Sequence, residues 1–189
     1  MKRKIINTSI SLFERKGFAE TSIQDIVNSL GVTKGTFYYY FSSKEELLLN
    51  IHLDYINGLI ERQEEILDCS GKTSRQKIQD LASLLIGDIR TKGLSAKVFF
   101  RELKLLSEDK LKEIVPKRNQ FRVNIEELIK QGMEKGELRS DMNPTIVTFG
   151  ILGILNWSYH WFNPDGAMTE NEVANLFVEM IMTGIEKGE

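Results

Sequence analysis

Apolar residues recur every three or four positions along almost the entire chain, a spacing typical of one face of an α-helix. Ile5, Leu12 and Phe13 form such a stripe near the start. No segment alternates apolar and polar residues for long, so the pattern predicts an all-α protein. The predicted helices run from the N-terminus to about residue 17 and then over residues 23–30, 34–41, 44–67, 74–92, 95–106, 109–135, 144–162 and 169–187.

The second and third predicted helices have recognisable start and stop residues. Ser22 can cap the helix that follows it, and Asp25 completes a pattern similar to a capping box. Gly31 can adopt the left-handed conformation that ends a helix, and Thr33 can cap the next one. Two short helices joined by such a tight turn form a helix-turn-helix, in which the second helix enters the DNA major groove.

The third predicted helix has two different faces. Phe37 and Phe41 lie four residues apart and are expected to face a small core. Residues 38–40 are three consecutive tyrosines, so at least one must be exposed, which is unusual in a helix that serves only packing. A tyrosine hydroxyl can donate to a phosphate oxygen while its ring packs on a sugar or a thymine methyl.

Two basic residues flank these tyrosines. Lys34 and Gly35 lie at the helix N-terminus, where free amides and the helix dipole favour a phosphate. Lys44 opens the next helix and can hold the DNA backbone on the other side. A solvated helical hairpin that binds no nucleic acid would show the same periodicity, so periodicity alone leaves both interpretations open.

The sequence GVTKGTFYYYFSSKEELL at 31–48, preceded by GFAETSIQDIV at 17–27, resembles the N-terminal signature of TetR-type transcriptional regulators. The resemblance covers about residues 3–50 without a gap. It departs at Tyr40, where the family often has His, and at Val27, where Ala is usual. The resemblance implies that Ser22 and Tyr38 contact phosphates and that Lys34, Thr36 and Tyr39 lie nearest the base edges. The full set of expected DNA-binding residues is Ser22, Thr33, Lys34, Gly35, Thr36, Tyr38, Tyr39, Tyr40 and Lys44.

Charge and loop signals indicate a chain in two parts. Residues 1–50 hold seven Lys or Arg and five Asp or Glu, whereas the remainder holds 18 and 22, so the head is weakly basic. Residues 68–73 form a predicted loop. With the resemblance, we expect a three-helix DNA-binding domain at 1–48 and a helical ligand-binding and dimerisation domain at 49–189. Cys69 is the single cysteine and no signal peptide is evident, so a cytoplasmic location is expected.

The C-terminal part contains two strongly apolar helices. Residues 142–164 have no Asp, Glu, Lys or Arg, but the polar residues among them favour a buried helix over a membrane span. Gly150 and Gly153 would let another helix come close. A single subunit of this size cannot easily bury two such helices. One short DNA-recognition helix also contacts too few bases for high specificity. Both points favour a homodimer, and the resemblance implies a four-helix interface from the last two helices of each subunit.

The resemblance also implies a ligand cavity among the middle helices. NWSYHWFNPDG at 156–166 is similar to a motif in a subset of these regulators that respond to acyl-CoA thioesters. A small hydrophobic or acyl-CoA-like effector is therefore expected, with Arg101, Arg118 and Arg122 as nearby cations. At each wall position, ordinary core packing is the competing explanation. The expected ligand-binding residues are Phe99, Phe100, Leu103, Phe121, Arg122, Ile125, Phe149, Leu152, Trp157 and Trp161.

Nothing in the sequence indicates catalysis, a cofactor or a metal. Residues 71–73, GKT, lack the earlier glycine of a phosphate-binding loop, and no Gly-x-Ser-x-Gly elbow occurs. His52, His160 and Cys69 do not share a metal-ligand spacing. We therefore expect a transcriptional repressor rather than an enzyme. We expect the effector to release this repressor from palindromic operator DNA. A transcriptional activator with the same head and an acyl-thioester-handling enzyme are the alternatives.

Overall fold

The computed structural model describes residues 1–185, and within them the chain is helical with no strand, which confirms the predicted all-α fold. The first three helices have nearly the predicted bounds. The helices are α1 (Lys2–Lys16), α2 (Ile23–Leu30), α3 (Lys34–Tyr40), α4 (Lys44–Leu67), α5 (Ser74–Glu102), the short 3₁₀ helix η1 (Leu103–Leu105), α6 (Glu108–Glu134), α7 (Pro144–Trp161) and α8 (Glu170–Ile185).

The middle of the chain is kinked at the place where the sequence predicts a break. We expected a break at Gly93 between two helices, and the adjacent Lys92 has a non-helical φ of −131° and ψ of 15°, so α5 consists of two helical stretches that meet at a kink. The predicted last helix also extended over residues 186 and 187, which lie outside the described residues.

The described chain forms two compact units whose sequences are interleaved. The N-terminal unit comprises Met1–Gly58 and Leu94–Lys117, and the C-terminal unit comprises Leu59–Gly93 and residues 118–185. Consequently α4, α5 and α6 each contribute residues to both units. The expected domain boundary after residue 48 stays a prediction.

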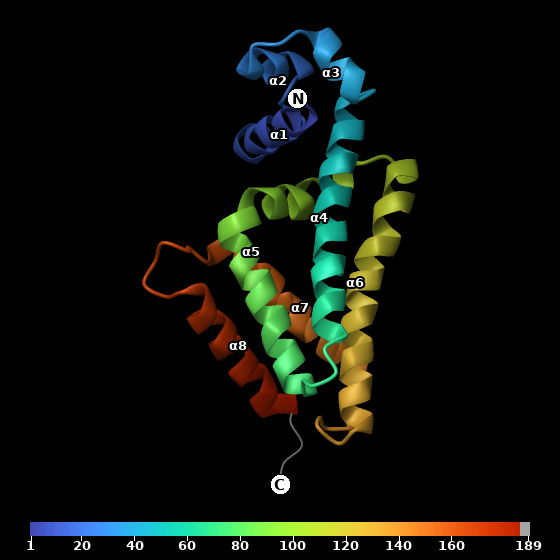
Figure 1. Cartoon of the computed structure of the whole chain (residues 1–189), viewed down its shortest axis with the longest axis vertical. Coiled ribbons are helices and arrows are strands. Elements are labelled where there is room, and N and C mark those ends of the chain that lie inside the picture. Colours follow the sequence, from blue (N-terminus) through green and yellow to red (C-terminus); the bar gives the residue numbers. More distant parts are fainter. Residues whose placement is uncertain (186–189) are drawn as a thin grey trace. The chain divides into compact units, whose positions relative to one another are not determined.

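The N-terminal unit is built around α1, α2 and α3, which pack side by side (Figure 1). Its core holds Ile5, Phe13, Ile26 and Phe37, all fully buried. Burying an aromatic or large aliphatic side chain contributes about 1.5–3 kcal/mol, so this cluster fixes the three short helices on one another.

Residues 94–117 belong to the same unit and are joined to α4 by polar contacts. Lys110 Nζ donates to Glu46 Oε2 at 2.7 Å, and the Ser107 amide donates to Glu45 Oε1 at 2.7 Å. Hydrogen bonding to the Ser107 amide and side chain lowers the pKa of the Glu45 carboxyl. Both contacts join the first turn of α4 to the segment around the start of α6.

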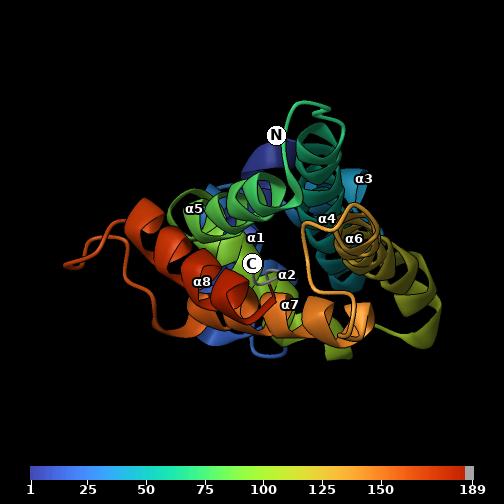
Figure 2. The same cartoon turned by 90° about the horizontal axis from the view of Figure 1, so that it is seen from below.

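In the C-terminal unit, α8 runs beside α7 and is tied to α5 (Figure 2). A buried polar network joins α4 to α6: Gln63 Nε2 donates to the Phe121 carbonyl at 2.9 Å, and Asn124 Nδ2 donates to Gln63 Oε1 at 2.8 Å. Arg62 and Asp88 form a bidentate ion pair between α4 and α5 at 2.6 and 2.7 Å. These partners satisfy polar groups that burial would otherwise penalise.

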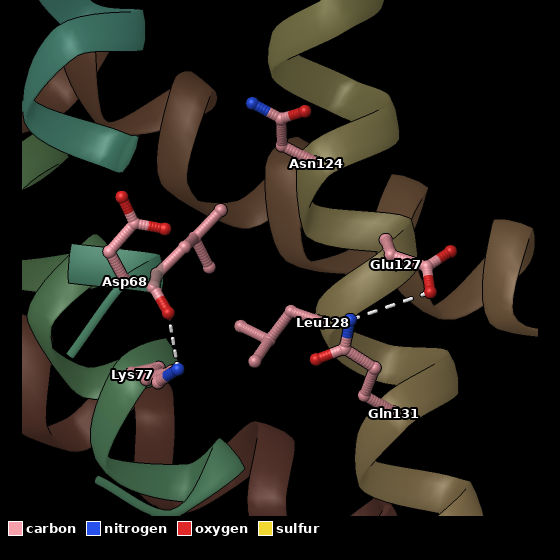
Figure 3. Close-up of a pocket in the computed structure, with 7 residues that line it drawn as sticks. Asp68, Lys77, Asn124, Glu127, Leu128 and Gln131 are labelled. Atoms are coloured by element: carbon pink, nitrogen blue, oxygen red, sulfur yellow. Dashed lines mark hydrogen bonds between the residues drawn. The ribbon is translucent and has the colours of Figure 1, made fainter. Parts of the chain in front are cut away.

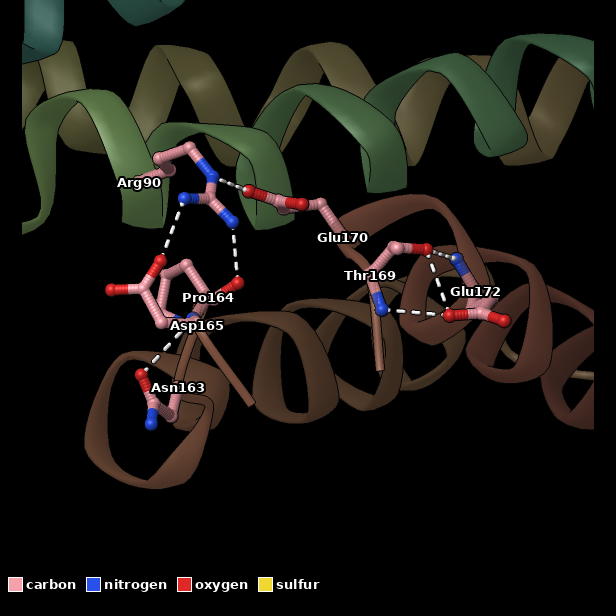
Figure 4. Close-up of polar contacts among 7 residues, drawn as sticks. All are labelled: Arg90, Asn163, Pro164, Asp165, Thr169, Glu170 and Glu172. Carbon is pink, nitrogen blue, oxygen red and sulfur yellow. Dashed lines mark hydrogen bonds and ion pairs between the residues drawn. The ribbon is translucent and has the colours of Figure 1, made fainter. Parts of the chain in front are cut away.

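The loop between α7 and α8 is held by one arginine. Arg90, on α5, donates to Glu170, to the Pro164 carbonyl and, at 3.0 Å, to Asp165 Oδ1 (Figure 4). Thr169 and Glu172 form a capping box that begins α8. The hydrogen bonds to Glu170 and Asp165 raise the pKa of the Arg90 guanidinium.

We expected α7 to be a buried helix, but in the single chain it is buried on one face only. Val147, Ile151 and Leu155 face the interior, whereas Ile146 and Trp157 are about two-thirds exposed. Among the described residues, no helix combines the length and apolar character needed to cross a bilayer.

Candidate functional site

The turn between α2 and α3 has the caps that the sequence predicts. Ser22 Oγ accepts from the Asp25 amide at 3.0 Å, and the Asp25 carboxylate accepts from the Ser22 amide at 2.8 Å, which makes a complete capping box. Gly31 has φ 65° and ψ 33°, the left-handed conformation that ends α2. Thr33 Oγ1 accepts from the Thr36 amide and begins α3.

The two faces of α3 separate as the sequence predicts. Phe37 is fully buried and Phe41 is 3% exposed, whereas Tyr38 is 53% and Tyr39 82% exposed. The Tyr38 ring lies edge-on to Phe37, with centroids 5.6 Å apart, and Tyr39 packs edge-on to Tyr40 at 4.8 Å. The buried phenylalanine anchors the helix, and the tyrosines form an aromatic, hydroxyl-bearing outer surface.

The start of α3 is open to solvent. Lys34 and Gly35 are exposed, and Thr36 is half-buried beside Thr33. A Cβ on Gly35 would meet only Thr33 Oγ1 at 3.5 Å, which is an ordinary contact. No neighbour within the N-terminal unit therefore demands glycine at this position.

Ser22 is exposed, but its hydroxyl group is engaged. The Ser22 Oγ donates to Asp25 Oδ2 at 2.7 Å while it accepts from the Asp25 amide. These hydrogen bonds from Ser22 are the main reason that the pKa of the Asp25 carboxyl is lowered. The expected phosphate contact of Ser22 would require its only hydroxyl proton to turn away from Asp25.

Lys44 also has partners within the chain. Its Nζ donates to the carbonyl oxygens of Phe18 at 2.7 Å, Ala19 at 3.3 Å and Thr21 at 2.6 Å. The ammonium group lies 4.4 Å from the centroid of the Phe18 ring. Sequence reasoning missed these partners, because the carbonyls belong to a turn more than twenty residues away.

Two of the cations considered for an anionic ligand are engaged elsewhere. Arg101 donates to the Phe13 and Glu14 carbonyls at the end of α1 and to Glu102 Oε1. Arg122 donates to Glu126 Oε2 at 2.5 Å. A helix C-terminus carries partial negative charge, so Arg101 stabilises α1.

The expected ligand-binding residues fall into three groups. Phe99, Phe100 and Leu103 belong to the N-terminal unit. Phe121 and Ile125 are buried in the C-terminal unit, with Arg122 and Leu152 half-buried. The remaining three, all on α7, are at least half exposed: Phe149, Trp157 and Trp161. Arg122 lies 5.6 Å from the centroid of the Phe149 ring.

A surface pocket of about 200 Å³ lies in the C-terminal unit, between the end of α4, α5 and α6 (Figure 3). None of the expected ligand-binding residues lines it. Lys77 donates to the Leu67 carbonyl there, and Gln131 Nε2 donates to Glu127 Oε1. The walls are Leu67, Asp68, Lys77, Asn124, Glu127, Leu128 and Gln131.

An exposed apolar face covers one side of α7 and α8. On α7 the exposed apolar residues are Ile146, Phe149, Trp157 and Trp161, and on α8 they are Leu176 and Met180. Gly150 and Gly153 lie on the same side of α7, and a Cβ on either would meet nothing within 4 Å. Within the described residues, no group of three or more His, Cys, Asp or Glu could hold a metal ion.

Known proteins resemble the chain over nearly its whole length. It is 24% identical over 186 residues to the HTH-type transcriptional repressor KstR2 of Mycobacterium tuberculosis, with 97% of this chain and 92% of the relative covered. It is 24% identical over 188 residues to the fatty acid metabolism regulator protein of Bacillus subtilis, with 96% and 94% covered. The solved structure of AibR in complex with isovaleryl coenzyme A and operator DNA has a TM-score of 0.84 at 26% identity, with 95% and 96% covered.

Two family models match most of the chain. The model for bacterial regulatory proteins of the tetR family matches residues 5–51, which include the helix-turn-helix. The model for the tetracyclin repressor-like C-terminal domain matches residues 71–185. The chain therefore belongs to the tetR family of bacterial regulatory proteins, which are DNA-binding transcriptional regulators.

Proposed function

We propose that this protein is a dimeric transcriptional repressor that binds a palindromic operator through α3 and leaves it when a small acyl-thioester effector binds. We infer the DNA-binding surface from Tyr38 and Tyr39, which are 53% and 82% exposed directly beside the buried Phe37. A helix anchored in this way presents its outer face at a fixed angle, which major-groove recognition requires.

The proposed contacts follow from the position of each residue on α3. The Tyr38 hydroxyl donates to a phosphate oxygen. Lys34, Thr36 and Tyr39 lie nearest the base edges. Gly35 lets the DNA backbone approach the helix N-terminus. Thr33 and Tyr40 complete the flanks of this surface, and Ser22 contacts a phosphate only when its hydroxyl leaves Asp25.

The exposed face of α7 and α8 is the proposed dimer interface. Among residues 1–185 it holds six exposed large apolar side chains, and burying apolar surface contributes about 25 cal/mol for each Å² removed from water. The open space above Gly150 and Gly153 gives room for a partner helix. A two-fold dimer places two copies of α3 on half-sites about 10 bp apart or a multiple of that.

The proposed effector is an acyl-CoA or a similar small hydrophobic molecule. Two similar proteins support this class: the Bacillus subtilis relative is named a fatty acid metabolism regulator, and AibR was solved with isovaleryl coenzyme A and operator DNA. The sequence motif at 156–166 points the same way. Within the C-terminal unit, Phe121, Ile125 and Leu152 are the proposed apolar wall, since Trp157 and Trp161 lie on the proposed dimer face.

The effector must bind the DNA-free state more tightly than the DNA-bound state. Only such a differential affinity can shift the equilibrium, and it makes DNA and effector weaken each other by the same factor. We propose repression because the relative KstR2 is named a transcriptional repressor. A reporter gene placed behind the operator distinguishes repression from activation.

The proposed function is tested with duplexes that the full-length protein selects from a random pool. Release is then measured with isovaleryl coenzyme A, longer acyl-CoAs, free coenzyme A and free fatty acids. We expect an inverted repeat, and release by at least one acyl-CoA but not by free coenzyme A. Failure to enrich any duplex would overturn the DNA-binding surface, and selected DNA that no acyl-CoA releases would overturn the effector class.

A further inference from the structure

Lys44, at the start of α4, makes more contacts with the chain than its exposed neighbours on α3 do. Its ammonium group has three N–H donors, and three carbonyl oxygens lie within hydrogen-bonding distance: Phe18 at 2.7 Å, Ala19 at 3.3 Å and Thr21 at 2.6 Å. It also lies over the Phe18 ring at 4.4 Å, a cation–π distance. All its donors are therefore used inside the N-terminal unit.

The turn that Lys44 binds leads directly into α2. Thr21 Oγ1 donates to the Gly17 carbonyl at 2.7 Å, which closes the turn. The next residue, Ser22, caps α2. Lys44 lies three residues after Phe41, which is the C-cap of α3. One side chain therefore joins the start of α2 to the exit of α3.

We propose that Lys44 is a positioning residue that fixes α2 relative to α3 by binding the α1–α2 turn, and that it makes no phosphate contact. This inference rests on the proposed DNA-binding function and replaces the expected role of Lys44 at the DNA backbone. An ammonium that turned toward DNA would give up its bonds to the Ala19 and Thr21 carbonyls, whereas the Phe18 carbonyl would keep the Thr21 amide as a donor at 3.3 Å.

Partial burial of Lys44 supports the same role. Burial is the main cause that lowers the pKa of its ammonium group, and the carboxylates of Glu20 and Asp25 oppose it. A cation placed to bind phosphate is better left in water until DNA arrives, because desolvation costs energy before any ligand is present. Lys34 is exposed in this way at the start of α3.

The two roles give different salt dependences. Each lysine that neutralises a phosphate releases counterions, so its removal lowers the slope of log affinity against log salt by about 0.9. A positioning residue releases none. Its removal weakens binding by a similar factor at every salt concentration, because the reading surface is misaligned before DNA is met.

The experiment compares Lys44→Ala and Lys44→Gln with Lys34→Ala as the matched control, all in the full-length protein. Operator affinity is measured by fluorescence anisotropy across a salt series. Hydrogen exchange of the Asp25 and Ile26 amides, which donate to Ser22 Oγ and to the Ser22 carbonyl, is measured without DNA. We expect both Lys44 variants to bind about tenfold more weakly with an unchanged salt slope, and the α2 amides to exchange faster. Lys34→Ala should lower the slope by about 0.9 and leave exchange unaltered.

A salt slope that falls by about 0.9 in the Lys44 variants, or unaltered exchange at the start of α2, would overturn the inference. The exchange measurement needs no DNA. If the wild-type protein binds no duplex, the proposed function fails, while the exchange result still decides whether Lys44 holds the turn. If Lys44→Ala unfolds, Lys44→Gln, which retains amide donors, provides the same comparison.

Discussion

Neighbouring aromatic residues of α3 have opposite environments. Phe37 is fully buried, whereas Tyr38 packs its ring edge against Phe37 and leaves 53% of its surface exposed. A phenylalanine would serve the packing of position 38 equally well, so the hydroxyl is the group that packing does not explain. The proposed explanation is a hydrogen bond to phosphate.

We expect Tyr38→Phe to weaken operator binding by about 1 kcal/mol, roughly fivefold, because one hydrogen bond is lost while the ring stays. The matched control is Tyr159→Phe, which loses a bond of 3.2 Å from its hydroxyl to the Leu85 carbonyl in the C-terminal unit. The control should lower stability without changing operator affinity. Both are measured by anisotropy titration and urea unfolding. An unchanged affinity of Tyr38→Phe would show that the hydroxyl faces elsewhere.

The Asp25 cap should make stability depend on acid pH. Its carboxyl has a folded pKa below the ordinary value of 3.8, mainly through hydrogen bonds from Ser22. Its stabilisation is therefore present above pH 3.8 and is lost as the pH falls through the folded pKa. We expect Asp25→Asn to lower the free energy of unfolding at neutral pH, with a difference that shrinks in acid. Urea unfolding at several pH values measures this, and a constant difference would contradict it.

At the scale of elements, the α7–α8 loop is ordered by a partner outside itself. Its internal hydrogen bonds are few: the Asp165 amide donates to Asn163 Oδ1 at 3.1 Å, and the Gly166 amide donates to the Asn163 carbonyl at 2.9 Å. Arg90 adds bonds to Pro164 and Asp165 from α5. The loop sets where α8 begins, so Arg90 helps to define the packing of α8.

We expect Arg90→Ala to speed hydrogen exchange of the Asp165 and Gly166 amides, because the loop loses its attachment to α5. The Thr169 amide, bonded to Glu172 within the α8 capping box, should change less. Arg75→Ala is the matched control, since Arg75 also joins α5 to α8 through Glu179 but lies away from the loop. Equal loop exchange in the two variants would show that Arg90 does not order it.

At the scale of the whole molecule, the apolar face of α7 and α8 is the feature that a single chain does not explain. Leu176 is 59% and Ile146 67% exposed. Large contiguous apolar surfaces on soluble proteins usually mark interaction sites. The proposed occupant is a second copy of this chain, because two reading helices are needed for a specific operator.

We expect Leu176→Glu to weaken dimerisation by about a hundredfold or more, since a two-fold interface loses two buried leucines at about 1.5–3 kcal/mol each. Val115→Glu is the matched control, because Val115 is 50% exposed on α6, outside the proposed face. Sedimentation equilibrium gives the dissociation constants, and circular dichroism confirms folding. A Leu176→Glu protein that stays dimeric would place the interface elsewhere.

The sequence by itself determined the helices, the helix-turn-helix and the two faces of α3. These features depend on short-range physics: residues three or four positions apart share a helix face, and caps such as Ser22 and Thr33 act within one turn. The burial of Phe37 and the exposure of Tyr38 and Tyr39 follow from that spacing. The signature at 31–48 added the family, because it encodes this local geometry.

Only the tertiary structure decided which partners the cations have. Lys44 binds carbonyls 23 to 26 residues away, and Arg101 binds the end of α1, 87 and 88 residues away. It likewise placed Trp157 and Trp161 on an exposed face. A charged or aromatic side chain has many possible partners of similar energy, so its role depends on which distant segments folding brings to it.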